Sequence, residues 1–207
     1  PDATKVPGAI MWSGSTDGPD AMPGTYRVKL RVGSKELNQT FEYRKDPRVQ
    51  TTPAEFREQF DFLLKIRDKV SAAHEAVNTI RDIRGQTNDL VKRLDKHPMK
   101  DTVAASAKKL NEKLKRIEEE IIQVKIKSGQ DALNYPIRLN DKIATLSGVV
   151  ASADTKPTRQ SYDVFAELSG KLDEQLSQFA AVIQTDLVVF NARVKNLDIP
   201  AVIIKPA

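Results

Sequence analysis

The spacing of apolar residues changes near residue 50, and this change divides the chain into two parts. Residues 25–32 place basic side chains on one face of an extended segment and apolar ones on the other, the latter being Tyr26, Val28, Leu30 and Val32. A period of two with one polar face predicts a half-buried β-strand. Gly33-Ser34 supplies a tight turn and residues 37–43 return, which predicts a β-hairpin. Residues 9–12 predict a third strand.

A module of three strands is too small to cover both faces of its own sheet. We therefore expect it to pack against the helices, against sequence upstream of Pro1, or against both. A start at Pro1 is typical of a mature form or an excised fragment. The predicted domains are a small Ig-like β module over residues 1–48 and a long-helix bundle over 49–198. The apolar tail at 199–206 is a candidate for completing the β module.

The first predicted helix has a well-marked start. Thr52-Pro53-Ala54-Glu55 is a capping box with proline at the first helical position. Apolar residues then follow a heptad pattern with two alternating seams, Phe56, Leu63, Val70, Val77 and Val91 in one and Ile66, Ala73, Ile80 and Leu94 in the other. We expect this helix to end at His97-Pro98, because the residue before proline avoids the α conformation. It would be a rod of about 65 Å.

Three more helices are expected, over about 101–126, 137–153 and 158–197. Short connections make neighbouring helices antiparallel. The first helix would then leave the β module and the last would return to it, bringing the tail beside the strands. The predicted fold is mainly α with a small β module: a long antiparallel bundle of three to four helices with coiled-coil-like seams, preceded by an Ig-like hairpin or partial sandwich.

Composition and charge narrow the function. The chain has no cysteine, so disulfides, thiol catalysis and Cys-based zinc sites are excluded. The net charge is +5, but Lys and Arg alternate with Asp and Glu, which is typical of solvated helix faces. The second helix is rich in lysine but has no aromatic residue for base stacking, so nucleic acid is not an expected partner. No run approaches the roughly 20 apolar residues that span a bilayer.

The residues that most often carry chemistry show no catalytic arrangement. His74 and His97 are too far apart along one helix to share a metal, and we interpret both as surface or structural residues. Residues 118–120 and 173–174 are adjacent carboxylates, which point in different directions on a helix and indicate solvated faces. Residues 15–18 (Ser-Thr-Asp-Gly) predict a tight loop. The sequence therefore predicts no catalytic, cofactor-binding or metal-binding residue.

Short motifs are spread over nearly the whole chain, at residues 18–30, 46–49, 59–61, 66–68, 77–81, 133–136, 139–142 and 157–162. In this order and spacing they resemble the C-terminal region of large secreted bacterial propeller proteins of the sortilin-like, BNR-repeat or glycosyl-hydrolase-like type. The resemblance implies an Ig-like or fibronectin-like remnant that follows a β-propeller. It also implies a periplasmic, outer-surface or secreted location. Any hydrolase activity would belong to the propeller.

Three functions remain open at this stage. The first is a non-catalytic accessory domain, a stalk or docking bundle for the propeller of the parent protein or for another protein. The second is a contribution to a glycosidase-like or peptidase-like active site in that propeller. The third is a carbohydrate or cell-surface binding module, for which Trp12, Tyr26 and Tyr43 are the candidate aromatics. The chain would be a monomer or a homodimer.

Overall fold

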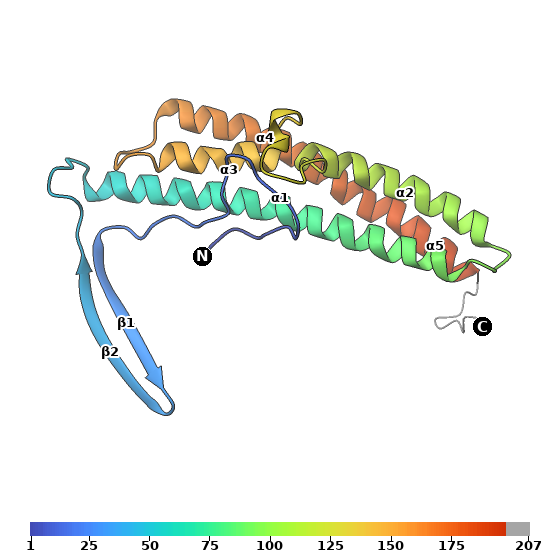
Figure 1. Ribbon diagram of the computed structural model, residues 1–207, viewed down its shortest axis with the longest axis horizontal. Helices are drawn as coiled ribbons and strands as arrows, with labels where there is room; N and C mark the ends of the chain where they lie inside the picture. Colours follow the sequence, from blue (N-terminus) through green and yellow to red (C-terminus); the bar gives the residue numbers. More distant parts are fainter. Residues whose placement is uncertain (198–207) are drawn as a thin grey trace.

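The structure is a computed structural model that describes residues 1–197, and it is mainly helical with a small two-stranded sheet (Figure 1). The predicted fold class is confirmed. In chain order the strands are β1 (Gly24–Val32) and β2 (Lys35–Tyr43), and the α-helices are α1 (Pro53–Arg93), α2 (Lys100–Ile121), α3 (Leu139–Val150), α4 (Arg159–Val182) and α5 (Val188–Asn196). A 3-10 turn at Asp131–Leu133 (η1) precedes α3, and a π-helical turn at Ile183–Leu187 (η2) joins α4 to α5.

The predicted start of α1 is confirmed in atomic detail. The Thr52 hydroxyl accepts a hydrogen bond from the Glu55 backbone N–H at 3.3 Å, and the Glu55 carboxylate accepts one from the Thr52 N–H at 2.9 Å. Pro53 occupies the first turn, where a missing N–H costs nothing. The helix ends at Arg93, earlier than predicted, because Leu94 is fully buried and caps the last turn before the proline is reached.

The helices form three rods, and the second rod is broken. Both α2 and α3 run antiparallel to α1, since Arg81 pairs with Glu118 on α2 and Gln59 bonds to Val150 at the end of α3. Residues 122–138 therefore join α2 to α3 without reversing the chain direction. The second helix stops at Ile121, short of its predicted end near residue 126.

The third rod, α4–η2–α5, runs parallel to α1. Tyr162 donates to Glu58 at 3.0 Å, and Lys69 pairs with Asp173 at 2.9 Å, so both helices advance in the same direction. The prediction that the last helix returns to the β module is wrong, because α5 lies at the opposite end of the bundle (Figure 1). Residues 199–206, the predicted closing strand, lie outside the described residues.

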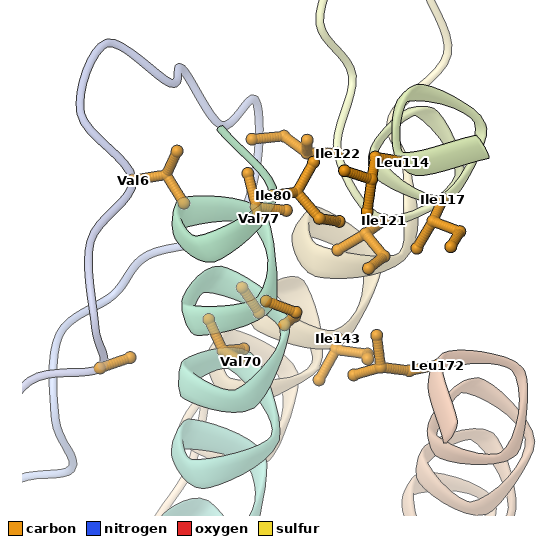
Figure 2. Close-up of a cluster of buried hydrophobic side chains, with 14 of the residues drawn as sticks. Val6, Val70, Val77, Ile80, Leu114, Ile117, Ile121, Ile122, Ile143 and Leu172 are labelled. Atoms are coloured by element: carbon orange, nitrogen blue, oxygen red, sulfur yellow. The ribbon is translucent and has the colours of Figure 1, made fainter. Parts of the chain in front are cut away.

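The core lies where the three rods meet. Val77, Ile80, Leu114 and Ile121 are almost completely buried between α1 and α2. Figure 2 shows Ile143 of α3 pointing toward Leu172 of α4, and both side chains are fully buried. Burying one side chain of this size contributes about 1.5–3 kcal/mol. The predicted seams are therefore the contacts that hold the bundle together.

The predicted β-hairpin is confirmed, but its surroundings differ from the prediction. Leu30 lies opposite Leu37 and Tyr26 opposite Phe41 in the antiparallel register, and Gly33 adopts a φ of 59° at the turn. The hairpin extends away from the bundle instead of packing on it (Figure 1). The predicted third strand at residues 9–12 is absent from the two-stranded sheet, which contains β1 and β2 alone.

Because the hairpin stands apart, its removal should leave the bundle intact. We expect a chain in which a short Gly-Ser linker replaces residues 24–43 to melt within about 2 °C of the wild type. Far-UV circular dichroism would measure this. Leu172→Ala serves as the reference, since emptying that buried position should cost about 2–5 kcal/mol. A loss of stability of that size on hairpin removal would contradict the described arrangement.

Candidate functional site

The outstanding surface feature is the apolar face of the hairpin, formed by Tyr26, Val28, Leu30, Val32, Leu37, Phe41 and Tyr43. Leu37 is 67% exposed, Val32 65% and Leu30 56%, although cross-strand pairing places them side by side. Tyr26 and Phe41 stack with their ring centres 5.9 Å apart. We call this set of seven residues the hairpin face; Gln39, opposite Val28, and Lys35, opposite Val32, lie on the same side. It is a preformed apolar surface that water covers in the isolated chain.

The opposite face of the hairpin is polar and carries charged side chains that are exposed to solvent. The Glu36 carboxylate pairs with Lys29 at 2.9 Å and with Arg31 at 3.1 Å, all on the side away from the hairpin face. These hydrogen bonds hold the pKa of Glu36 below its ordinary value. Charged side chains along both strands also discourage pairing of the hairpin edges with another strand. The two faces therefore differ sharply in what they can bind.

The base of the hairpin is tied to the bundle by polar contacts. Lys45 donates from Nζ to the Thr51 carbonyl oxygen at 2.8 Å, and the Thr51 hydroxyl donates to the Asp154 carbonyl oxygen just beyond α3. Gln59 of α1 donates to the carbonyl oxygens of Val150 and Ala153, at 2.7 and 2.8 Å. These bonds fix the return strand to α1 and to the end of α3, so the bundle determines where the hairpin points.

Residues 1–18 form an extended strap that lies along α1 and α3. Its buried side chains, Ala3 and Val6, pack on the core (Figure 2 shows Val6). Its carbonyl oxygens accept from α1: Asn78 donates to Lys5 at 3.0 Å and Arg81 donates to Pro7 at 3.1 Å. The strap thus covers the groove between α1 and α3.

Asp141 fastens the returning half of the strap to α3. Its carboxylate accepts backbone hydrogen bonds from Trp12 at 2.6 Å, Ser13 at 3.3 Å and Gly14 at 2.7 Å. A Cβ on Gly14 would lie 2.5 Å from the Cβ of Ala144, so only glycine allows this approach. These bonds hold residues 12–14 against α3, away from the hairpin, so the predicted strand at residues 9–12 is part of the strap instead.

His74 lies at the junction of the strap, α1 and α3. Its Nδ1 is 2.6 Å from the Thr4 carbonyl oxygen, and its Nε2 is 3.1 Å from Nδ2 of Asn140. Because the Thr4 carbonyl oxygen can only accept and the Asn140 amide nitrogen can only donate, we infer a neutral imidazole whose proton is on Nδ1. Burial lowers the pKa of His74, although the bond to Thr4 acts in the opposite direction. Of the two interpretations left open by the sequence, surface or structural, the burial of His74 and its two partners favour the structural one.

The depressed pKa of His74 makes stability depend on pH. Below about pH 6.5 the unfolded chain binds a proton that the folded chain resists, so the free energy of unfolding should fall as the pH drops. One such group contributes a slope of at most about 1.4 kcal/mol per pH unit. Urea unfolding between about pH 7 and pH 5.5 would measure it.

His74→Gln should flatten this pH dependence, while His97→Gln should leave it unchanged. An equal slope in wild type and His74→Gln would show that other groups carry the effect.

A buried ion cluster joins α1 to α2. The Glu118 side chain is almost completely buried, and its carboxylate accepts from Nε of Arg81 at 2.7 Å and from Arg84. The sequence interpretation of residues 118–120 as a solvated acidic face is therefore wrong for Glu118. The missed signal is the pair of arginines three residues apart on α1, of which Arg84 occupies a heptad position that is apolar elsewhere in the seam.

Removing the Glu118 charge should leave two arginines without their anion. We expect Glu118→Gln to lower the free energy of unfolding by about 3 kcal/mol. The matched control is Glu120→Gln, because Glu120 is exposed and its pair with Arg138 spans 3.5 Å; its cost should stay below about 0.5 kcal/mol. Urea unfolding curves would compare the two. Equal effects of the two substitutions would refute a special role of the buried cluster.

The remaining candidate residues lie apart from one another. Trp12 is 45% exposed beside α3, whereas Tyr43 is 47% exposed at the base of the hairpin. His97 is in the turn after α1. Among residues 1–197, no group of three or more His, Cys, Asp or Glu side chains could hold a metal ion. In the same part of the chain, every helix is too short or too polar to cross a membrane.

Comparison of the chain with protein-family models, with curated proteins and with solved structures finds no match. Functional inference therefore starts from the surfaces of the chain itself. Of these, the hairpin face is the most distinctive, because its side chains are apolar, ordered by cross-strand pairing and exposed together.

Proposed function

We propose that this chain is a non-catalytic interaction domain whose helical bundle holds the hairpin face against a β-sheet of a larger protein. The exposure of the hairpin face carries this proposal. A lone two-stranded hairpin is marginally stable in water, and a second layer that covers its apolar side would stabilise it. Removing apolar surface from water stabilises the covered state by a free energy of about 25 cal/mol per Å².

The geometry of the hairpin favours a sheet as the covering surface. Two nine-residue strands present a twisted ribbon about 30 Å long and about 10 Å wide. Sheets pack face to face at about 10 Å with their apolar residues interdigitated, which suits alternating residues such as Leu30 and Leu37. Edge pairing is less favourable, because both strands have a free edge and both carry charged side chains, Lys29 and Arg31 on β1 and Glu36 and Glu42 on β2.

The area of the hairpin face favours a partner within the same polypeptide. The ribbon covers about 300 Å² in outline, whereas a stable interface between free proteins buries about 800 Å² on each side. A covalent link raises the effective concentration to the millimolar range and makes a small interface sufficient. The resemblance to secreted propeller proteins supplies such a partner, a β-propeller preceding this chain in an extracytoplasmic protein.

The buried titratable groups support a structural role. His74 is bonded to Thr4 and Asn140, Asp141 to backbone N–H groups of the strap, and Glu118 to two arginines. Each holds segments of the fold together. This use of the groups favours an interaction domain over a contribution to a hydrolase active site.

Site-specific photo-crosslinking in the producing cell tests the proposal. A benzophenone amino acid at Leu37, on the hairpin face, should form a crosslink with a β-strand of the parent protein. Mass spectrometry would identify the joined peptides. The same probe at Asn38, one residue further and on the polar face, is the matched control and should give little product.

Equal yields at the two positions would refute a face-specific contact. Crosslinks from Leu37 to a second copy of the chain would also overturn the proposal, because they would identify a homodimer.

A further inference from the structure

The side chains that hold the strap follow a regular pattern on α1, and this pattern continues beyond the strap. Arg67, Ser71, His74, Asn78 and Arg81 contact strap residues 1–7. They are spaced by three or four residues, as neighbours on one helix face are. The same spacing, continued along α1, leads to Asn88 and Lys92. Asn88 is seven residues after Arg81, and Lys92 is fourteen residues after Asn78. This stretch of α1 therefore presents the same face as the strap-binding stretch.

The strap leaves this face at its turn. Arg81 bonds to the carbonyl oxygen of Pro7, and Gly8 then reverses the chain with a φ of 72°. Beyond that point an open hollow of about 490 Å³ lies between α1 and α2. It lies further along the rod that α2 and α3 form, and the cluster of Glu118 with Arg81 and Arg84 separates it from the strap. We call this hollow the distal groove.

The residues of the distal groove resemble those that bind the strap. Asn88 is exposed, and its Oδ1 accepts from Nδ2 of Asn111 at 3.0 Å. The Thr87 hydroxyl donates to Oδ1 of Asn111 at 2.9 Å, which orients the amide pair. Asn88 keeps its own Nδ2–H groups for an incoming carbonyl oxygen, the role that Asn78 performs toward Lys5.

The distal groove is also positively charged. Lys92, Lys108 and Lys115 line it, together with one carboxylate, Glu112. Lys92 also pairs with Asp89 at 3.0 Å and Lys115 with Glu119 at 3.7 Å, but both pairs are solvent-exposed and weak, so an incoming carboxylate can compete for these lysines. Lys108 forms no ion pair with any residue in the described part of the chain.

The floor of the groove is mainly apolar and includes Val91, Ala104 and Ala107, whereas the lysines and Asn88 form its rim. We expect an extended chain to lay small side chains on this floor and its carbonyl oxygens against the polar rim, as the strap does on α1, whereas a helix about 10 Å across would need a wider seam.

We propose that the distal groove binds an extended, acidic peptide segment of a partner protein in the manner in which α1 binds the strap. Backbone carbonyl oxygens of the segment accept from Asn88, and its carboxylates pair with Lys92, Lys108 and Lys115. This surface is separate from the hairpin face, and the inference does not depend on the proposed function. The α1 face that the groove shares with the strap and the charge of the lining together select the occupant.

Two fluorescein-labelled peptides test this inference on the full chain. The probe is a short peptide of alternating Glu and Thr, which favours an extended chain, and its counterpart has Lys in place of Glu. We expect fluorescence anisotropy to detect binding of the acidic peptide alone. NMR should show shifts of the side-chain amide signals of Asn88 and Asn111. Absence of binding, or equal binding of both peptides, would overturn the inference.

Charge-reversed variants locate the site. Lys108→Glu combined with Lys115→Glu should weaken binding of the acidic peptide by about tenfold or more. The matched control is Lys65→Glu combined with Lys109→Glu, two exposed lysines outside the groove, which changes the net charge equally and should alter affinity by less than about twofold. Equal losses in the two double variants would show general attraction to a basic protein and would refute a defined groove.

Discussion

The attachment of α3 to α1 is the contact on which the rest of the fold depends. The second rod is broken between Ile121 and Leu139, so α3 is a separate helix of 12 residues, too short to be stable alone. It is held at its beginning by Asn140 and Asp141, through His74 and the strap, and at its end by Gln59. These polar contacts complement the apolar contact between Ile143 and Leu172. Without them, α4 would lose one of the three helices against which it packs.

The same contacts connect the core to the hairpin. The chain leaves α3 through Asp154, which accepts the Thr51 hydroxyl next to the cap of α1, while the strap returns from Asp141 toward β1. The segments that lead into β1 and out of β2 are thus both tied to the bundle, at Gly14 and at Thr51. The hairpin contributes little to the bundle, yet the bundle fixes the position from which the hairpin projects. A rigid base of this kind suits an apolar surface that must meet a partner.

Local signals in the sequence were sufficient to predict the hairpin, the capping box of α1 and the apolar seams. Each depends on residues close in the chain, such as Thr52 with Glu55 or Leu30 with Leu37. The direction of α4 was not predictable, because the connection between α2 and α3 continues the rod instead of reversing it. Likewise, Glu118 is buried because two arginines 34 and 37 residues away face it. Periodicity along one helix carries no information about such a partner.

The exposure of the hairpin face has the same explanation. Alternation of polar and apolar residues predicts that one face is covered, but it does not identify the covering surface. In the described chain the bundle does not cover it, because the apolar face of α1 is already filled by α2, α3, α4 and the strap. The exposed side chains of Leu30, Leu37 and Phe41 form an apolar patch on a hairpin whose other face is charged, and such a patch lowers the solubility of the chain. This effect is offset when another sheet covers the face. The distal groove lies about 50 Å along α1 from the start of that helix, where the hairpin is attached. A partner in the groove would therefore not compete with a partner on the hairpin face.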